Sequence, residues 1–63
     1  MRAKDFFANE KAFSDLLDDA EDKADTEWEM EFVASMTARY EDYGMDTFLS
    51  YDQLRSLHRI ADK

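Results

Sequence analysis

The sequence contains no cysteine, no proline and one glycine, Gly44. Without cysteine the chain can form neither a disulfide nor a thiolate zinc site, and it has no thiol nucleophile. No stretch approaches the roughly 18 apolar residues of a membrane span, and the first residues, MRAKDFFANEK, lack the apolar run of a signal peptide. We therefore expect a soluble protein of the cytoplasm with no membrane partner.

Basic residues are scarce as well: 8 lysines and arginines stand against 16 aspartates and glutamates, which gives a net charge of −8. Residues 1–31 hold eleven of the acids and four bases, so most of the excess lies in the N-terminal half. Such a surface repels nucleic acid and anionic membranes, and it attracts basic protein surfaces. A disordered acidic tail is disfavoured because nine aromatic residues supply anchors for a core.

Apolar residues recur at helical spacing and never alternate as in a strand, which predicts an all-α fold, a small three-helix bundle in one domain of residues 1–63. The expected helices cover about residues 4–24, 27–43 and 51–62. Two forms of the first helix stay open. It is either continuous, or it is broken near Asn9, which would then cap a helix that begins at Glu10.

Short motifs mark the ends of the other helices. Thr26 and Glu29, like Ser50 and Gln53, have the spacing of a capping box, in which each side chain bonds the other residue's backbone amide. Gly44 stands where a helix ends with a left-handed residue. These signals predict helix starts near residues 27 and 51 and a helix end near residue 43.

The predicted core is made by one apolar side of each helix. Its members are Phe13, Leu16, Leu17, Ala20 and Ala24, then Trp28, Phe32, Val33, Met36, Tyr40 and Tyr43, and finally Leu54, Leu57, Ile60 and Ala61, with Phe48 and Leu49 closing the base. Phe7 either packs under the N-terminus or is an exposed interface anchor. Because a chain this short buries only about 60% of its unfolded surface, a homodimer is a natural way to enlarge the core.

The first long helix carries an acidic side opposite its apolar side on a wheel of about 100° per residue. The predicted partner-binding residues are Asp15, Asp18, Asp19, Glu21, Asp22 and Asp25. These six carboxylates span roughly 16 Å of helix at about 1.5 Å per residue, or one charge per ~2.7 Å, compared with one per ~3.4 Å along a DNA strand. A basic groove would meet a charge density similar to that of nucleic acid. A purely solvated face is the competing interpretation.

A basic row, Arg55, Arg59 and Lys63, follows the last helix at intervals of four residues. Three roles stay open for it. The row lies beside the acids of the first helix, pairs with a second copy of the chain, or is solvated, which is the usual state of exposed charges.

No residue set indicates catalysis, a cofactor or a resident metal. His58 is the single histidine, and no cysteine accompanies it as a nucleophile. Asp18 and Glu29 match positions 1 and 12 of an EF-hand loop, but Ala20 and Lys23 occupy positions 3 and 6, where the loop needs an oxygen ligand and glycine. We expect no enzyme, and unspecific binding of divalent cations along the acidic side stays an alternative.

The second and third predicted helices resemble a known pattern. Its residues are Trp28, Glu29, Phe32, Val33, Met36, Arg39, Tyr40, Leu49, Ser50, Gln53, Leu57, Ile60 and Ala61. This pattern resembles a helix-turn-helix segment of small phage proteins, and it covers residues 28–61. The resemblance implies a small acidic protein of a bacteriophage, of the kind that includes anti-CRISPR and other host-takeover inhibitors. It implies no functional residue, because the matching positions are structural.

Together these observations favour a phage-type inhibitor in the host cytoplasm. Its expected partner is a host protein with a basic nucleic-acid-binding surface, a CRISPR effector above all, and it would act as a DNA mimic without binding nucleic acid itself. The alternatives are a structural or adaptor module that self-associates through apolar helix faces, and an acidic protein that binds divalent cations.

Overall fold

A computed structural model describes all residues from Met1 to Lys63 and confirms the all-α prediction. Four α-helices and one 3-10 turn follow one another along the chain. They are α1 (Ala3–Phe6), α2 (Glu10–Lys23), α3 (Glu27–Tyr43), η1 (Gly44–Asp46) and α4 (Tyr51–Ala61). The last two helices agree with the predicted ranges, apart from a one-residue difference at the end of α4.

The first helix is broken, and the Asn9 form of the prediction is correct. The Asn9 side chain accepts a hydrogen bond from the backbone amide of Ala12 at 2.9 Å, so a new helix begins at Glu10. The outer bounds of the predicted range 4–24 each differ by one residue, because α1 begins at Ala3 and α2 stops at Lys23, and Asp25 lies in the turn that follows.

The remaining helix ends are set by the motifs read from the sequence. Thr26 and Ser50 each form a complete capping box, with Glu29 and Gln53. Gly44 ends α3 with φ 57° and ψ −129°, a combination that glycine adopts at little steric cost. The connections are therefore fixed locally, by residues next to each helix end.

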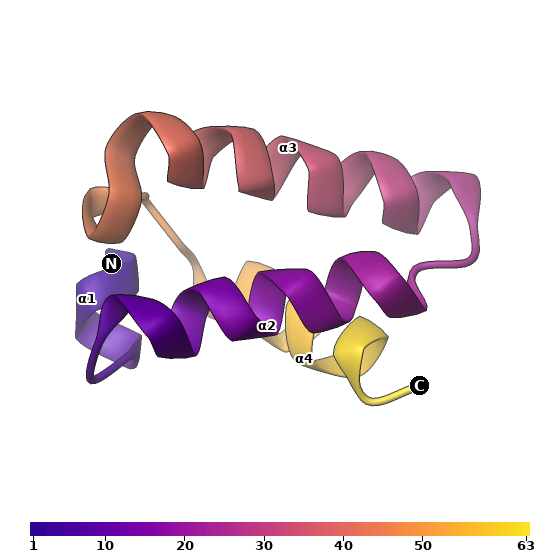
Figure 1. Cartoon of the computed structure of the whole chain (residues 1–63), viewed down its shortest axis with the longest axis horizontal. Coiled ribbons are helices and arrows are strands. Elements are labelled where there is room, and N and C mark those ends of the chain that lie inside the picture. The colour runs from indigo at the N-terminus through magenta and orange to yellow at the C-terminus, as the bar shows by residue number, and fades with distance from the viewer.

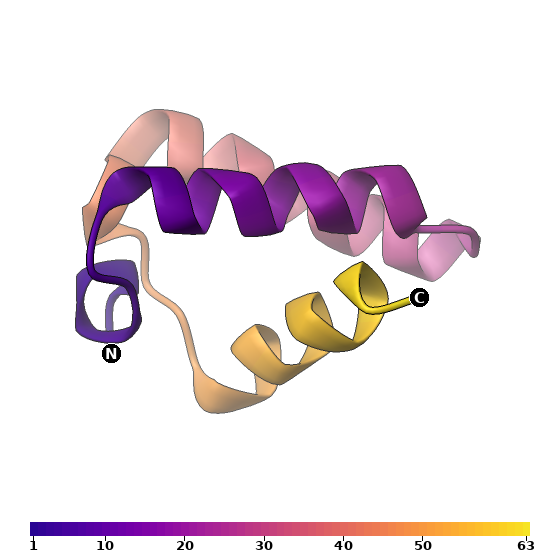
Figure 2. The same ribbon diagram turned by 60° about the horizontal axis from the view of Figure 1, so that its bottom comes forward.

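Helix α2 packs against both other long helices. Figure 1 shows α3 running antiparallel to α2, and Figure 2 shows α4 returning along another side of α2. Helices α3 and α4 approach each other less closely than either approaches α2. The buried residues of the core are Ala3, Phe13, Leu16, Leu17, Ala20, Val33, Met36, Leu49, Leu57 and Ile60.

The N-terminus is tied to the connection between α3 and α4. The amide of Leu49 donates to the Met1 carbonyl at 2.8 Å, and the amide of Ala3 donates to the Thr47 carbonyl at 2.9 Å. Thr47 is fully buried, and its hydroxyl donates to the carbonyl of Gly44 at 2.7 Å. This short pairing of extended segments holds α1 against the base of the bundle, near η1 (Figure 1).

Three large residues predicted for the core are exposed: Trp28 by 57%, Tyr43 by 64% and Phe48 by 62%. Trp28 and Tyr43 stand at the first and last turns of α3, and Trp28 stacks on Phe32 with ring centroids 5.2 Å apart. Phe48 lies in an extended segment, where successive side chains point to opposite sides. Since Thr47 and Leu49 point inward, Phe48 must point outward.

The other predicted apolar positions pack as expected. Phe7 stacks on the buried ring of Phe13, with centroids 4.9 Å apart, so it packs under the N-terminus and is not a free anchor. The partly buried residues around the core include Ala24, Phe32, Tyr40, Leu54 and Ala61.

Neighbouring substitutions at residues 48 and 49 test this packing. Leu49→Ala should lower the free energy of unfolding by about 2–5 kcal/mol, because it leaves a cavity at a fully buried position. Phe48→Ala should cost less than about 1 kcal/mol, because most of the ring is already in water. Urea unfolding followed by circular dichroism measures both. Equal losses for the two variants would show that Phe48 belongs to the core.

Candidate functional site

All six predicted partner-binding carboxylates are exposed, and the fold uses two of them internally. Lys11 pairs with Asp15 at 2.9 Å, and Lys63 pairs with Asp25 at 2.7 Å. The other four form no ion pair and accept no hydrogen bond within the chain. We call Asp18, Asp19, Glu21 and Asp22 the free carboxylates.

The free carboxylates lie within five consecutive residues, 18–22, which is slightly more than one turn in the second half of α2. Asp18 and Asp22 are four residues apart and point away from the buried side made by Phe13, Leu17 and Ala20. Asp19 and Glu21 flank them on opposite sides of the helix. Because the side chains project from one rigid helix with caps at its start, their relative spacing is fixed before any partner arrives.

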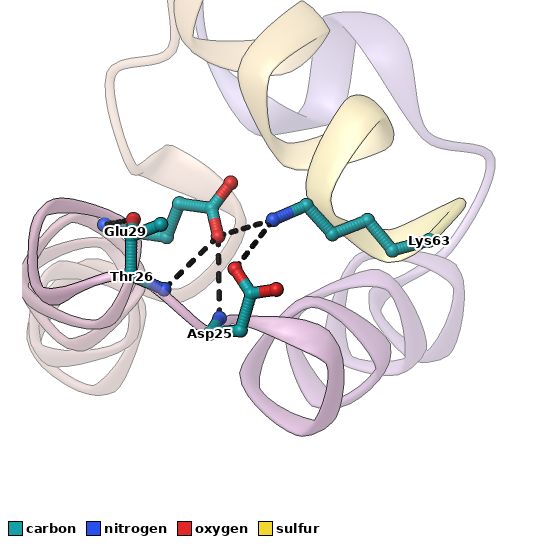
Figure 3. A network of polar contacts seen from close by, with 4 residues as sticks. All are labelled: Asp25, Thr26, Glu29 and Lys63. Carbon is teal, nitrogen blue, oxygen red and sulfur yellow. Dashed lines mark hydrogen bonds and ion pairs between the residues drawn. The ribbon is translucent and has the colours of Figure 1, made fainter.

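Asp25 belongs to a structural network that also contains Thr26, Glu29 and Lys63 (Figure 3). Lys63 binds both Asp25 and Glu29, and the Glu29 side chain is only 13% exposed. The same Glu29 oxygen accepts the backbone amides of Asp25 at 3.2 Å and Thr26 at 3.4 Å. The network joins the end of α4 to the turn between α2 and α3.

This network also changes proton affinities. Lys63, followed by the backbone amide of Asp25, lowers the pKa of Glu29 from 4.5 to about 2. The hydrogen bonds to Asp25 and Glu29 raise the pKa of Lys63 above its ordinary value. Of the basic row, Lys63 therefore lies beside the acids, whereas Arg55 and Arg59 are exposed and form no ion pair.

A second acid, Glu10, fixes α3 to the start of α2. The Tyr40 hydroxyl donates to the Glu10 carboxylate at 2.7 Å, and this bond raises the pKa of Tyr40. Some of the acidic residues thus have a structural role, in a capping box, in an ion pair or in this hydrogen bond. The free carboxylates have no such structural use.

A groove lies beside the free carboxylates, between α2 and α3. Its volume is about 250 Å³, and four of its five lining residues are hydrophobic. The lining residues are Glu21, Ala24, Met30, Val33 and Ala34. The sequence interpretation did not find this groove, because it depends on how closely two helices approach. The only sign of the groove in the sequence is Met30, an apolar residue on a side of α3 that is otherwise polar.

A second, more open depression lies at the other end of the molecule. Arg2, Tyr43, Asp46 and Phe48 line about 380 Å³ there. Two of its lining residues, Tyr43 and Phe48, are exposed aromatic residues. One arginine and one carboxylate at its wall give it no strong charge of either sign.

The structure shows no cluster of metal-binding side chains. No group of three or more histidine, aspartate and glutamate side chains is placed to hold a metal ion. His58 is exposed on α4. No helix is both long and apolar enough to cross a lipid bilayer.

Comparisons with known proteins add no assignment. The sequence matches no protein-family model, and no curated protein or solved structure shows significant similarity to it. Function must therefore be argued from the surface itself.

The Lys63 network predicts a pH-dependent contribution to stability. A carboxyl group with a lowered pKa stabilises the fold above its ordinary pKa of 4.5, and this contribution is lost as the pH falls toward about 2. Lys63→Met should lower the melting temperature at neutral pH, and the difference from the unmodified protein should shrink across that window. Thermal unfolding at several pH values measures it.

Lys11→Met is the matched control, because it breaks an ion pair whose side chains are 81% and 57% exposed. Such pairs contribute little, so its melting temperature should stay close to that of the unmodified protein at every pH. If the loss in Lys63→Met does not depend on pH, the stability that Lys63 contributes does not come from its ion pairs with the carboxylates.

Proposed function

We propose that this protein is a non-enzymatic inhibitor whose free carboxylates on α2 dock on a basic, nucleic-acid-binding surface of another protein. The observation that carries the proposal is the presence of four exposed carboxylates within residues 18–22 that no residue of the chain pairs with. Docking would exclude nucleic acid from the partner both by occupying the surface and by neutralising its charge.

The free carboxylates have no cationic partner within the fold. Lys23 lies on the same helix as the free carboxylates, is exposed, and forms no ion pair with any of them. The repulsion among the four charges is therefore not relieved within the chain. A partner that brings several lysines or arginines would relieve it and would be attracted at long range, which speeds association.

The sign of the net charge favours a basic protein over nucleic acid or an anionic membrane as the partner. Nucleic acid and anionic membranes would be repelled by the net charge of −8. The resemblance of residues 28–61 to small phage proteins supports a host-takeover role, with CRISPR effectors as candidate partners in the host cytoplasm. These complexes hold nucleic acid in positively charged channels, which is the kind of surface that the free carboxylates complement.

A second candidate function, a module that self-associates or recruits partners through aromatic side chains, is favoured by a different observation. Trp28, Tyr43, Phe48 and Tyr51 are each more than half exposed. Exposed aromatic residues are enriched at protein interfaces. In this case binding would depend on Trp28 and its stacked neighbour Phe32, and changes to the acidic residues would have little effect.

Charge reversal separates the two candidates. The double variant Asp18→Lys with Asp22→Lys should abolish capture of partners from a bacterial lysate while leaving the helical circular dichroism spectrum intact. Both residues are exposed and unpaired, so the change acts on the surface and not on the core. Capture by the unmodified protein should also weaken at high salt, because exposed charges are screened beyond about 8 Å at physiological ionic strength.

The matched control reverses the same number of charges elsewhere. Glu31→Lys with Asp42→Lys changes two exposed acids on the outer side of α3 and keeps the same net charge as the test variant. It should retain capture. Undiminished capture by the α2 variant, together with loss in Trp28→Ala, would refute the charge mechanism in favour of the aromatic one.

A further inference from the structure

We propose that the groove between α2 and α3 is a socket for one arginine side chain of the partner. This inference rests on the proposed function and names the residue type that the acidic surface receives. Its lining residues place the groove next to the free carboxylates, near residues 24–26, which join α2 to α3.

The size of the groove suits one side chain better than a larger occupant. A volume of about 250 Å³ is below the roughly 300–1,000 Å³ of most small-molecule pockets. A helix or strand needs a longer surface than five residues provide. A single extended side chain fits this volume, and the groove is open enough to admit it from solvent.

The chemistry of the walls matches a side chain that is apolar along its stem and charged at its tip. Ala24, Met30, Val33 and Ala34 provide the hydrophobic wall, and Glu21 is the one charged residue in the lining. Long basic side chains bury their methylene groups on apolar surface and keep the charge at a polar edge. A purely aliphatic side chain would leave the Glu21 carboxylate without a cationic partner.

Charge around the mouth favours the same occupant. Asp18 lies three residues before Glu21 on α2, and Glu27 lies three residues before Met30 on α3, so both are neighbours of the lining on their own helices. Both are exposed and unpaired. No basic residue of the chain lines the groove or forms an ion pair with Glu21, so the cation must come from a partner.

Arginine fits better than lysine for two reasons. Its planar guanidinium donates two parallel hydrogen bonds to one carboxylate, whereas the lysine ammonium acts as a point charge. Guanidinium is also more weakly hydrated, so it loses less on entering a partly apolar groove. Glu21 would accept the two bonds while Met30, which is 54% exposed in the free protein, covers the stem.

Nuclear magnetic resonance titration with defined peptides tests the socket. The probes are short capped peptides of glycine with arginine, lysine or leucine at the same positions. The arginine peptide should shift the methyl signals of Met30 and Val33 and bind about tenfold more tightly than the lysine peptide, the effect expected from one further charge-assisted hydrogen bond. Equal affinity for the lysine peptide, or tighter binding of the leucine peptide, would overturn the inference.

Two variants test the lining with matched controls. Ala34→Phe fills the groove without a change of charge, and Ala38→Phe adds the same ring to another exposed alanine of α3 outside the lining. Glu21→Gln removes the charged wall, and Glu31→Gln makes the same change at an exposed glutamate on the outer side of α3. Ala34→Phe and Glu21→Gln should both abolish the preference for arginine, and both controls should retain it.

The outcomes distinguish this inference from the function on which it rests. If reversal of Asp18 and Asp22 abolishes partner capture while Ala34→Phe and Glu21→Gln leave the arginine preference unchanged, the socket is wrong and the acidic surface stands. If charge reversal also leaves capture unchanged, the proposed function fails. Since Glu21→Gln adds no volume, it keeps the test decisive even if Ala34→Phe disturbs the fold.

Discussion

The structure depends on burying the apolar side of α2 against two helices at once. Phe13, Leu17 and Ala20 are almost completely shielded from water, and α2 is the element that packs along both α3 and α4. With its inner side occupied in this way, α2 leaves its opposite side in water, where carboxylates cost little. The same packing sets the separation of α2 and α3, and hence the groove beside Glu21. The placement of α2 therefore determines both the core and the candidate binding surface.

Some acidic residues stabilise the fold, whereas others stay unpaired on its surface. Glu29 caps α3 and binds Lys63, Glu10 accepts the Tyr40 hydroxyl, and Asp25 shares Lys63. These acids lie at helix ends and junctions, where a backbone amide or a side chain from another element reaches them. The middle of the outer side of α2 meets no other element. Its carboxylates therefore stay unpaired, which makes them available to a basic partner and suppresses association with acidic ones.

The sequence predicted the parts that depend on local chemistry, and it failed where tertiary placement decides. The caps at Asn9, Thr26 and Ser50 and the positive φ of Gly44 follow from neighbouring residues, so the helices were placed well. The periodic pattern could not show that Trp28 is exposed in the first turn of α3 or that Phe48 points outward from an extended segment. The i, i+4 spacing of Lys11 and Asp15 is a local signal for their ion pair, but no such signal separates the free carboxylates from Asp25. The partner of Asp25, Lys63, is 38 residues away in the sequence, and no local rule pairs them.

The central claim is that α2 takes the place of nucleic acid on a basic protein surface. Competition measures it most directly: a fluorescently labelled duplex is bound to the captured partner, and its anisotropy is followed as this protein is added at increasing salt. The account predicts that the duplex is displaced completely, that displacement requires more protein as salt rises, and that no complex contains all three components. A stable ternary complex, with the duplex still bound while this protein is saturating, would contradict it.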